Sequence, residues 1–177
     1  MMMTVQQKFY LDAVRELKCL RTDQLHTLLR EKFHEPGRAD VNEGHMAAML
    51  RQLRYGNWDI RVDGELVHLA GAEPDPRLLE AIDVMLELSE GSPQDFRRGR
   101  SPVLLRFSLG GKKLRLFSVA DLTAAASPDT LERQRMERIV WISEGGEPPE
   151  GLTLPRRHFF AARRPDGSHR FYGSSEP

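Results

Sequence analysis

Apolar residues recur at intervals of three or four positions in three stretches near the start of the chain, with charged residues between them. This spacing places the apolar side chains on one face of an α-helix. It predicts helices over residues 4–20, 23–33 and 43–55. The predicted buried faces are Phe9, Ala13, Leu17 and Leu20 in the first helix, Leu25, Leu28, Leu29 and Phe33 in the second, and Met46, Met49, Leu50 and Leu53 in the third.

Polar residues at the ends of these stretches agree with the helix prediction. Thr22 and Asn42 have oxygen-bearing side chains that cap helix N-termini. Asp23 and Glu43 each supply a first-turn acid, which interacts favourably with the helix dipole. Gly56 follows the third stretch, at a position where glycine readily ends a helix.

Apolar and polar residues alternate over residues 58–69, which predicts a β-hairpin directly after the third helix. Asp63-Gly64 is a favoured sequence for a two-residue type I′ turn. Counting outward from this turn pairs Ile60 with Val67 and Trp58 with Leu69 as one apolar face, and places Asp59, Arg61 and His68 on the other face.

The rest of the chain predicts a second unit, reached through a hinge over Ala72–Pro76. The elements expected after the hinge are a helix over 77–90, a basic loop over 91–102, a hairpin that turns on Gly110-Gly111, a helix from Ser127 to about Arg138, a short buried strand over 139–143 and a hairpin that turns on Pro165-Asp166-Gly167. We therefore expect an α+β protein with two domains. Residues 1–71 would hold three helices and a hairpin, and residues 77–177 a small α+β domain with a mixed or antiparallel sheet.

Composition adds few constraints. Of the 177 residues, 40% are hydrophobic and 29% are charged, which is typical of folded soluble proteins. No apolar run approaches the ~18 residues that span a bilayer, so we expect no membrane association and a cytoplasmic protein. Cys19 is the single cysteine, which excludes a disulfide framework within the chain. The net charge of zero argues against strong non-specific binding to polyanions.

The order of three helices and a hairpin, carried by RTDQLHTLLREKF, NEGHMAAMLRQLRYGNW and DIRVDGELVHL, resembles winged helix-turn-helix domains over residues 5–70. The RTDQL entry to the second helix, with a compact α+β domain after the hairpin, resembles the replication-relaxation type of protein of bacterial mobile elements. The resemblance implies an N-terminal domain that binds double-stranded DNA and, because winged helices often act as dimers, a homodimer. For many relatives it implies a C-terminal domain with the restriction-endonuclease topology.

The residues of the second domain do not fit such a nuclease. Nucleases of this kind place an acid on one strand and Asp/Glu-x-Lys on the next, because two carboxylates hold the metal ion and the lysine assists. The paired segments VLLRFSL and KKLRLFSV carry no acid. We therefore expect no enzyme activity, no cofactor and no small-molecule substrate. The alternative to a chain without a metal site is a site formed by His34 and Glu35 together with His45.

The exposed side of the third predicted helix carries the candidate nucleic-acid-binding residues. In a winged helix this element lies in the major groove, where arginine contacts guanine edges and phosphates. One alternative is a solvated helix face, because arginine and glutamine are good surface helix formers. Another is a protein-interaction module that buries this helix and the hairpin against a partner or a second copy. The candidates are His45, Arg51, Gln52, Arg54 and Tyr55, with Arg61 on the hairpin.

A second group of basic residues lies around the central hairpin, and we consider it a candidate for contact with an anion or a partner. The Gly110-Gly111 turn pairs Phe107 with Leu114, Leu105 with Leu116, and Arg106 with Arg115. Like charges directly opposed destabilise a sheet. An acid of the chain (Glu80, Asp83, Glu87, Glu132 or Glu137), a phosphate or an acidic partner surface must therefore compensate. The members of the group are Arg97, Arg98, Arg100, Arg106, Lys113 and Arg115.

The last predicted hairpin interleaves arginines with aromatic residues. Such a pattern on strands can bind single-stranded nucleic acid through stacking and phosphate contacts. Aromatic residues on strands are more often core, and a cross-strand pair of Phe160 with Tyr172 would simply pack, so we favour the core interpretation. The residues concerned are Arg156, Arg157, Arg163, Arg164 and Arg170 with Phe159, Phe160, Phe171 and Tyr172.

Overall fold

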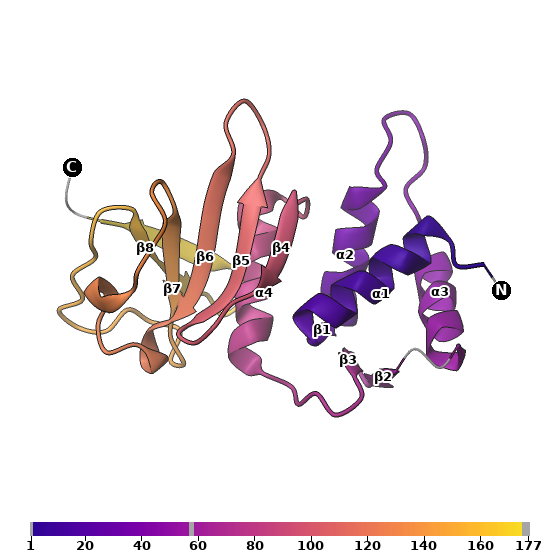
Figure 1. Ribbon diagram of the computed structural model, residues 1–177, viewed down its shortest axis with the longest axis horizontal. Coiled ribbons are helices and arrows are strands. Elements are labelled where there is room, and N and C mark those ends of the chain that lie inside the picture. Colours follow the sequence, from indigo (N-terminus) through magenta and orange to yellow (C-terminus); the bar gives the residue numbers. More distant parts are fainter. Residues whose placement is uncertain (1, 57–58, 175–177) are drawn as a thin grey trace. The chain divides into compact units, whose positions relative to one another are not determined.

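The computed structural model describes residues 2–56 and 59–174 and has mixed α and β structure (Figure 1). It divides into two compact units, Met1–Asp75 and Pro76–Pro177, called here the N-terminal and the C-terminal unit. The α+β class expected from the sequence is therefore confirmed. The predicted pairing of Trp58 lies outside the described residues.

The N-terminal unit contains three helices and a three-stranded antiparallel sheet with the order β1-β3-β2. All four apolar residues predicted for the third helix are buried, and Asn42 caps that helix by accepting a hydrogen bond from the backbone N–H of His45 at 2.8 Å. The elements are α1 (Val5–Leu17), β1 (Cys19–Arg21), α2 (Thr22–Lys32), α3 (Glu43–Tyr55), β2 (Ile60–Asp63) and β3 (Leu66–Leu69).

The first helix ends earlier than predicted. Lys18 takes a positive φ of 69°, which stops α1, and Cys19 and Leu20 enter β1 instead of a last helical turn. Leu20 is fully buried and pairs with Val67 of β3. Thr22 is the first residue of α2 rather than its cap, and its hydroxyl donates to the backbone carbonyl of Glu65. The sequence pattern does not distinguish these cases, because Leu20 is apolar whether it is buried in a helix or in a strand.

The β2–β3 hairpin has a different register from the predicted one. Its turn residues are Gly64 and Glu65, so that Ile60 pairs with Leu69 and Val62 with Val67. This shift of two residues leaves each side chain on its predicted face, because side chains alternate with a period of two. Ile60 and Val67 are therefore buried as expected. Pairing of β3 with β1 on its other edge accompanies the observed register.

The C-terminal unit is a six-stranded sheet in the order β4-β5-β6-β7-β8-β9, with α4 against it (Figure 1). The β6–β7 and β7–β8 pairs are parallel and the others are antiparallel. A buried cluster that includes Trp141 and Phe160 packs beneath Leu122, Ala125 and Leu131. The elements are α4 (Pro76–Ser89), β4 (Asp95–Arg98), β5 (Val103–Leu109), β6 (Arg115–Asp121), the 3₁₀ turns η1 (Leu122–Ala124) and η2 (Pro128–Thr130), β7 (Arg138–Ile142), β8 (His158–Arg163) and β9 (His169–Gly173).

The predictions for two segments of this unit are wrong. The basic loop over 91–102 contains the edge strand β4. The helix expected up to Arg138 is only the 3₁₀ turn η2, followed by irregular chain. Leu131 is half-buried and Met136 is 56% exposed with a φ of 74°. Good local helix propensity is not sufficient here, because isolated short helices need an apolar face that packs.

The register of β5 and β6 is also wrong in the prediction. Leu109 pairs with Arg115 and Phe107 with Phe117, so a loop of residues 110–114 replaces the two-residue Gly110-Gly111 turn. This shift of three residues exchanges the faces of β6 relative to the prediction. Phe107 stacks on Phe117 with ring centroids 5.1 Å apart. The longer loop thus places two aromatic rings, rather than a phenylalanine and a leucine, on the same buried face.

Candidate functional site

The exposed face of α3 carries the residues that the sequence singled out. His45, Arg51, Gln52, Arg54 and Tyr55 are all exposed, and Tyr55 is 82% exposed. They lie outside the buried stripe of the helix because α-helical residues advance by about 100° each. By the same geometry Arg51 and Arg54 project about 60° apart, close enough for both to face one surface.

These five side chains differ in how they are held. Gln52 accepts a hydrogen bond from the side chain of Gln7 at 2.7 Å, so it links α3 to the start of α1. Arg51 and Arg54 form no ion pair or hydrogen bond through their side chains within residues 2–56 and 59–174. Both guanidinium groups therefore keep their donors available to a molecule outside the chain.

Arg61 lies on the exposed face of the β2–β3 hairpin, opposite His68. One guanidinium nitrogen donates to the carbonyl of Ile60 at 3.1 Å. His68 lies 2.7 Å from Asp63, and this hydrogen bond raises the pKa of the imidazole above its usual value. Protonation of His68 is therefore favoured by the Asp63 carboxylate, which balances the charge of the imidazolium.

A groove that the sequence analysis missed lies between α2, the start of α3 and the β2–β3 turn. Its charges are mixed, since Arg21 and Arg30 occur together with Asp23, Glu43 and Glu65. An anion would meet three carboxylates there. The C-terminal half of α3, by contrast, carries Arg51 and Arg54 away from Glu43.

In the C-terminal unit, Arg106 has a buried acidic partner. Its Nε lies 3.8 Å from a carboxylate oxygen of Glu137 and donates to the hydroxyl of Ser118 at 3.3 Å. Glu137 also accepts from that hydroxyl and from the backbone N–H of Gln134. Glu137, one of the five considered acids, thus compensates Arg106. The predicted opposition to Arg115 is wrong because of the register shift.

Arg97 of β4, rather than Arg115, lies directly opposite Arg106. Both arginines line a small cavity of about 60 Å³, together with Asp95 and Glu137. Two cations and two carboxylates balance there, which makes the cavity a weak anion site. The other basic candidates of this region, Arg98, Arg100, Lys113 and Arg115, are exposed.

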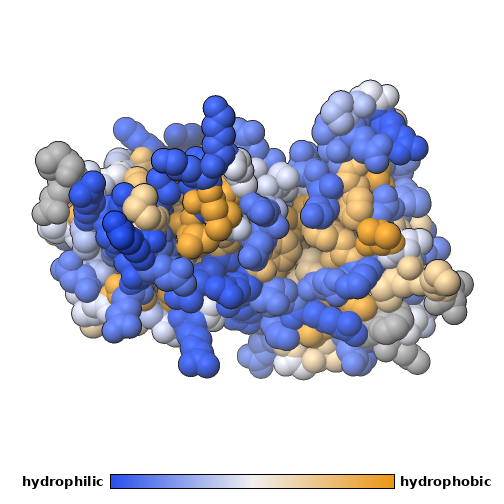
Figure 2. All heavy atoms as spheres, turned by 45° about the horizontal axis from the view of Figure 1, so that its top comes forward, coloured by the Kyte–Doolittle hydropathy of each residue, from blue (hydrophilic) through white to orange (hydrophobic). Residues whose placement is uncertain are grey.

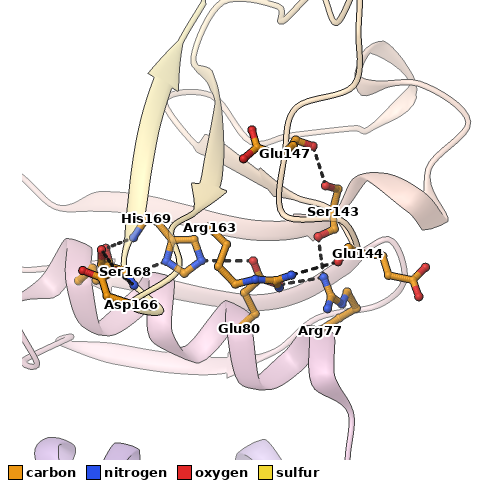
Figure 3. A network of polar contacts seen from close by, with 10 residues as sticks. Arg77, Glu80, Ser143, Glu144, Glu147, Arg163, Asp166, Ser168 and His169 are labelled. Atoms are coloured by element: carbon orange, nitrogen blue, oxygen red, sulfur yellow. Dashed lines mark hydrogen bonds and ion pairs between the residues drawn. The ribbon is translucent and has the colours of Figure 1, made fainter.

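A buried ion network joins α4 to the β8–β9 hairpin, as Figure 3 shows. The Glu80 carboxylate accepts from Arg77 and Arg163, each at 2.8 Å, and lies 3.2 Å from His169 Nε2. The other ring nitrogen of His169 lies 2.6 Å from Glu87. Sequence analysis missed this network, because α4 and the hairpin are about 80 residues apart.

The network keeps His169 charged. Burial alone lowers the pKa of this imidazole, but hydrogen bonds to Glu80 and Glu87 outweigh burial and raise the pKa above its usual value. The His169 side chain is fully buried, so no substrate can reach it. This arrangement ties α4 to the β8–β9 hairpin. Arg163 donates to Glu80 and to the backbone carbonyl of Glu144, so its guanidinium is engaged within the unit.

The aromatic residues of the last hairpin fit the core interpretation only in part, because Phe159 and Phe171 are half-buried and Tyr172 is 40% exposed. Phe160 is fully buried and pairs with Tyr172, as expected. Trp141 donates its indole N–H to His158 Nδ1 at 2.9 Å within the same buried region. Burial lowers the pKa of His158 and keeps it neutral, so it can accept this bond.

The described residues of the two units offer no cluster of metal-binding side chains. No group of three or more His, Cys, Asp or Glu side chains is placed to hold a metal ion among these residues. His34 instead pairs with Asp40 at 2.7 Å. None of the described helices has both the length and the apolar character needed to cross a membrane.

Figure 2 shows hydrophilic side chains over much of the visible face of each unit, with smaller apolar areas among them. The surface alone therefore does not single out a large apolar docking face in this view. No protein-family model, curated protein or solved structure matches this chain.

Proposed function

We propose that the N-terminal unit is a winged helix that binds double-stranded DNA. In this proposal α3 enters the major groove and the β2–β3 hairpin is the wing. The order α1-β1-α2-α3-β2-β3 and the β1-β3-β2 sheet support it. The function is that of a non-catalytic, cytoplasmic transcriptional or mobile-element accessory factor.

The observation that carries the proposal is the exposure of Arg51 and Arg54 without an acidic partner among the described residues. Residues 1–71 hold ten acids and have no net charge, yet these two cations on α3 have no ion-pair partner among the described residues. An exposed arginine fork matches a phosphate or the O6 and N7 acceptors of guanine. His45 and Arg61 extend the same set of donors toward the start of α3 and the wing.

The lack of net charge over residues 1–71 affects the expected mode of binding. A protein with little excess positive charge gains little from non-specific counterion release. Binding therefore depends on a few well-placed contacts, and affinity for random duplex should be weak. In this proposal Arg51, Arg54 and Tyr55 contact the base edges and so recognise the DNA sequence.

The test is fluorescence anisotropy of the full chain with labelled duplex DNA, at about 50 and 200 mM salt. We expect binding in the micromolar range that weakens with salt. The double variant Arg51→Ala with Arg54→Ala should bind at least ~10-fold more weakly, the loss expected for two charge-assisted contacts. Replacing Arg135 and Arg156, two exposed arginines of the C-terminal unit, changes the net charge equally and is the matched control. Absence of binding by the wild-type chain at low salt would exclude the proposal.

A protein-interaction module is the second candidate, and one observation favours it. Tyr55 is 82% exposed and Val5 is 74% exposed in the same unit. Aromatic residues at this exposure are common anchors of protein interfaces. Light scattering of the wild-type chain and a Tyr55→Ser variant separates the candidates. A concentration-dependent dimer that Tyr55→Ser disrupts, with no DNA binding, favours the module.

A further inference from the structure

The loop between β5 and β6 extends beyond the ends of the neighbouring strands (Figure 1). We call residues Lys112, Lys113, Leu114 and Arg115 the basic tip. All four are exposed, as are Gly110 and Gly111 before them. Gly111 has a φ of 128°, which only glycine adopts without strain and which lets the chain reverse here.

The three cations of the basic tip have no ion-pair partner in the described part of the chain. No acid occurs between Val103 and Asp121 in the sequence, so neither β5 nor β6 offers a carboxylate before Asp121. Three cations so close together repel one another in the free protein. A polyanion removes this repulsion, which solvent only screens.

Leu114 is the second unusual feature of the tip. It is 60% exposed, although a two-residue turn on Gly110-Gly111 would have placed it opposite Phe107 on the buried face. In the observed register Phe117 takes that place. The longer loop therefore holds a large apolar side chain in solvent between cationic neighbours.

We infer that the basic tip is a second nucleic-acid contact, in which Lys112, Lys113 and Arg115 bind backbone phosphates and Leu114 packs against sugars and base edges in the minor groove. This inference rests on the proposed function and assigns a role to the C-terminal unit within it. Strands bind DNA in either groove, and minor-groove proteins combine Lys or Arg with an apolar wedge residue. The tip has this composition.

A membrane surface is the competing partner, and the structure disfavours it. Interfacial binding grows with the apolar area that enters the headgroup region. The tip offers one leucine, and the apolar neighbours Leu109 and Phe117 are already buried in the protein. Phosphates of a duplex, by contrast, require only closely spaced cations.

The test compares three variants of the full chain by anisotropy over a series of salt concentrations. The first replaces Lys112, Lys113 and Arg115 by Gln, and the second is Leu114→Ser. The charge-matched control replaces Arg135, Arg156 and Arg164, which are exposed elsewhere in the same unit, by Gln. Because all the substituted side chains are exposed, each variant should unfold at the same temperature as the wild type. Thermal unfolding checks that each variant is folded.

The triple tip variant should reduce the slope of log K against log salt by about two to three, because each phosphate contact contributes close to one. Leu114→Ser should keep the slope and weaken binding about threefold to tenfold, as expected for one lost apolar contact. The control triple should behave like the wild type.

The two proposals fail in different ways. A tip variant that binds like the control, while the Arg51 and Arg54 double variant loses binding, overturns the tip contact and leaves the proposed function intact. A wild-type chain that does not bind duplex overturns both. Binding to vesicles with ~30% anionic lipid that the tip variant abolishes, without any effect of that variant on duplex binding, would assign the tip to a membrane surface instead.

Discussion

In the N-terminal unit Arg51 and Arg54 extend from α3 without an ion pair to any described residue, whereas in the C-terminal unit Arg77 and Arg163 both donate to the buried carboxylate of Glu80. The first pair keeps its donors available. The second pair is already bound to a carboxylate of the same chain. Arginine content therefore says little about binding until the partner of each guanidinium is known.

Removing the common partner of the buried pair should have the largest effect. Glu80→Gln leaves Arg77, Arg163 and His169 without the charge that they share. Breaking a buried charged cluster costs about 3–5 kcal/mol of unfolding free energy. Denaturant unfolding followed by circular dichroism measures the loss, with exposed Glu132→Gln as the control. A change below about 1 kcal/mol would contradict a structural role for the network.

The second buried acid should matter less. Glu137→Gln weakens the contact with Arg106, which is itself 39% exposed, and keeps one oxygen that can accept from either Ser118 or Gln134, since these two donors bond to different oxygens of the carboxylate. We expect a loss of about 1–3 kcal/mol, as for a buried hydrogen bond that involves a charge. The same unfolding measurement tests it. A loss equal to that of Glu80→Gln would show that the two clusters are equivalent.

Two histidines should give opposite pH dependences. His169 is held protonated, so its contribution is present below about pH 6.5 and is lost as pH rises through its raised pKa. His26 is partly buried, and burial lowers its pKa, so stability is undiminished above about pH 6.5 and falls as pH decreases toward the lowered pKa. Each slope is at most about 1.4 kcal/mol per pH unit.

NMR titration of the histidine ring protons measures both pKa values directly. His169 should titrate above the usual range and His26 below it. In a His169→Gln variant the unfolding free energy should no longer decrease as the pH rises above about 6.5, which would support this assignment. Titration of both rings near pH 6.5 would contradict it.

The smallest effect on stability is expected for the free pair. Replacing Arg51 and Arg54 by Ala removes exposed side chains without described partners, and alanine is a good helix former. The unfolding free energy should change by less than about 0.5 kcal/mol. A large loss would show that these arginines are structural after all, like Arg77 and Arg163, and would remove the contrast between the units.

Local patterns predicted much of the N-terminal unit. The apolar stripe of α3 and its Asn42 cap are confirmed, because helix period and capping depend on residues within one or two turns of each other. The stripe ending in Leu20 was misassigned, since burial in β1 and burial in a helix require the same residue type. The exposed arginines of α3 could be identified from sequence, but their lack of partners could not.

In the C-terminal unit the sequence by itself determined the α+β class, the turn at Pro165-Asp166-Gly167 and the pairing of Phe160 with Tyr172. Only the tertiary structure decided strand register and charge pairing. Register depends on which rings stack, as Phe107 and Phe117 do, and a pattern of period two does not distinguish the alternatives by itself. Charge pairing depends on residues far apart in sequence, as with Glu80 and His169, so it has no local signal.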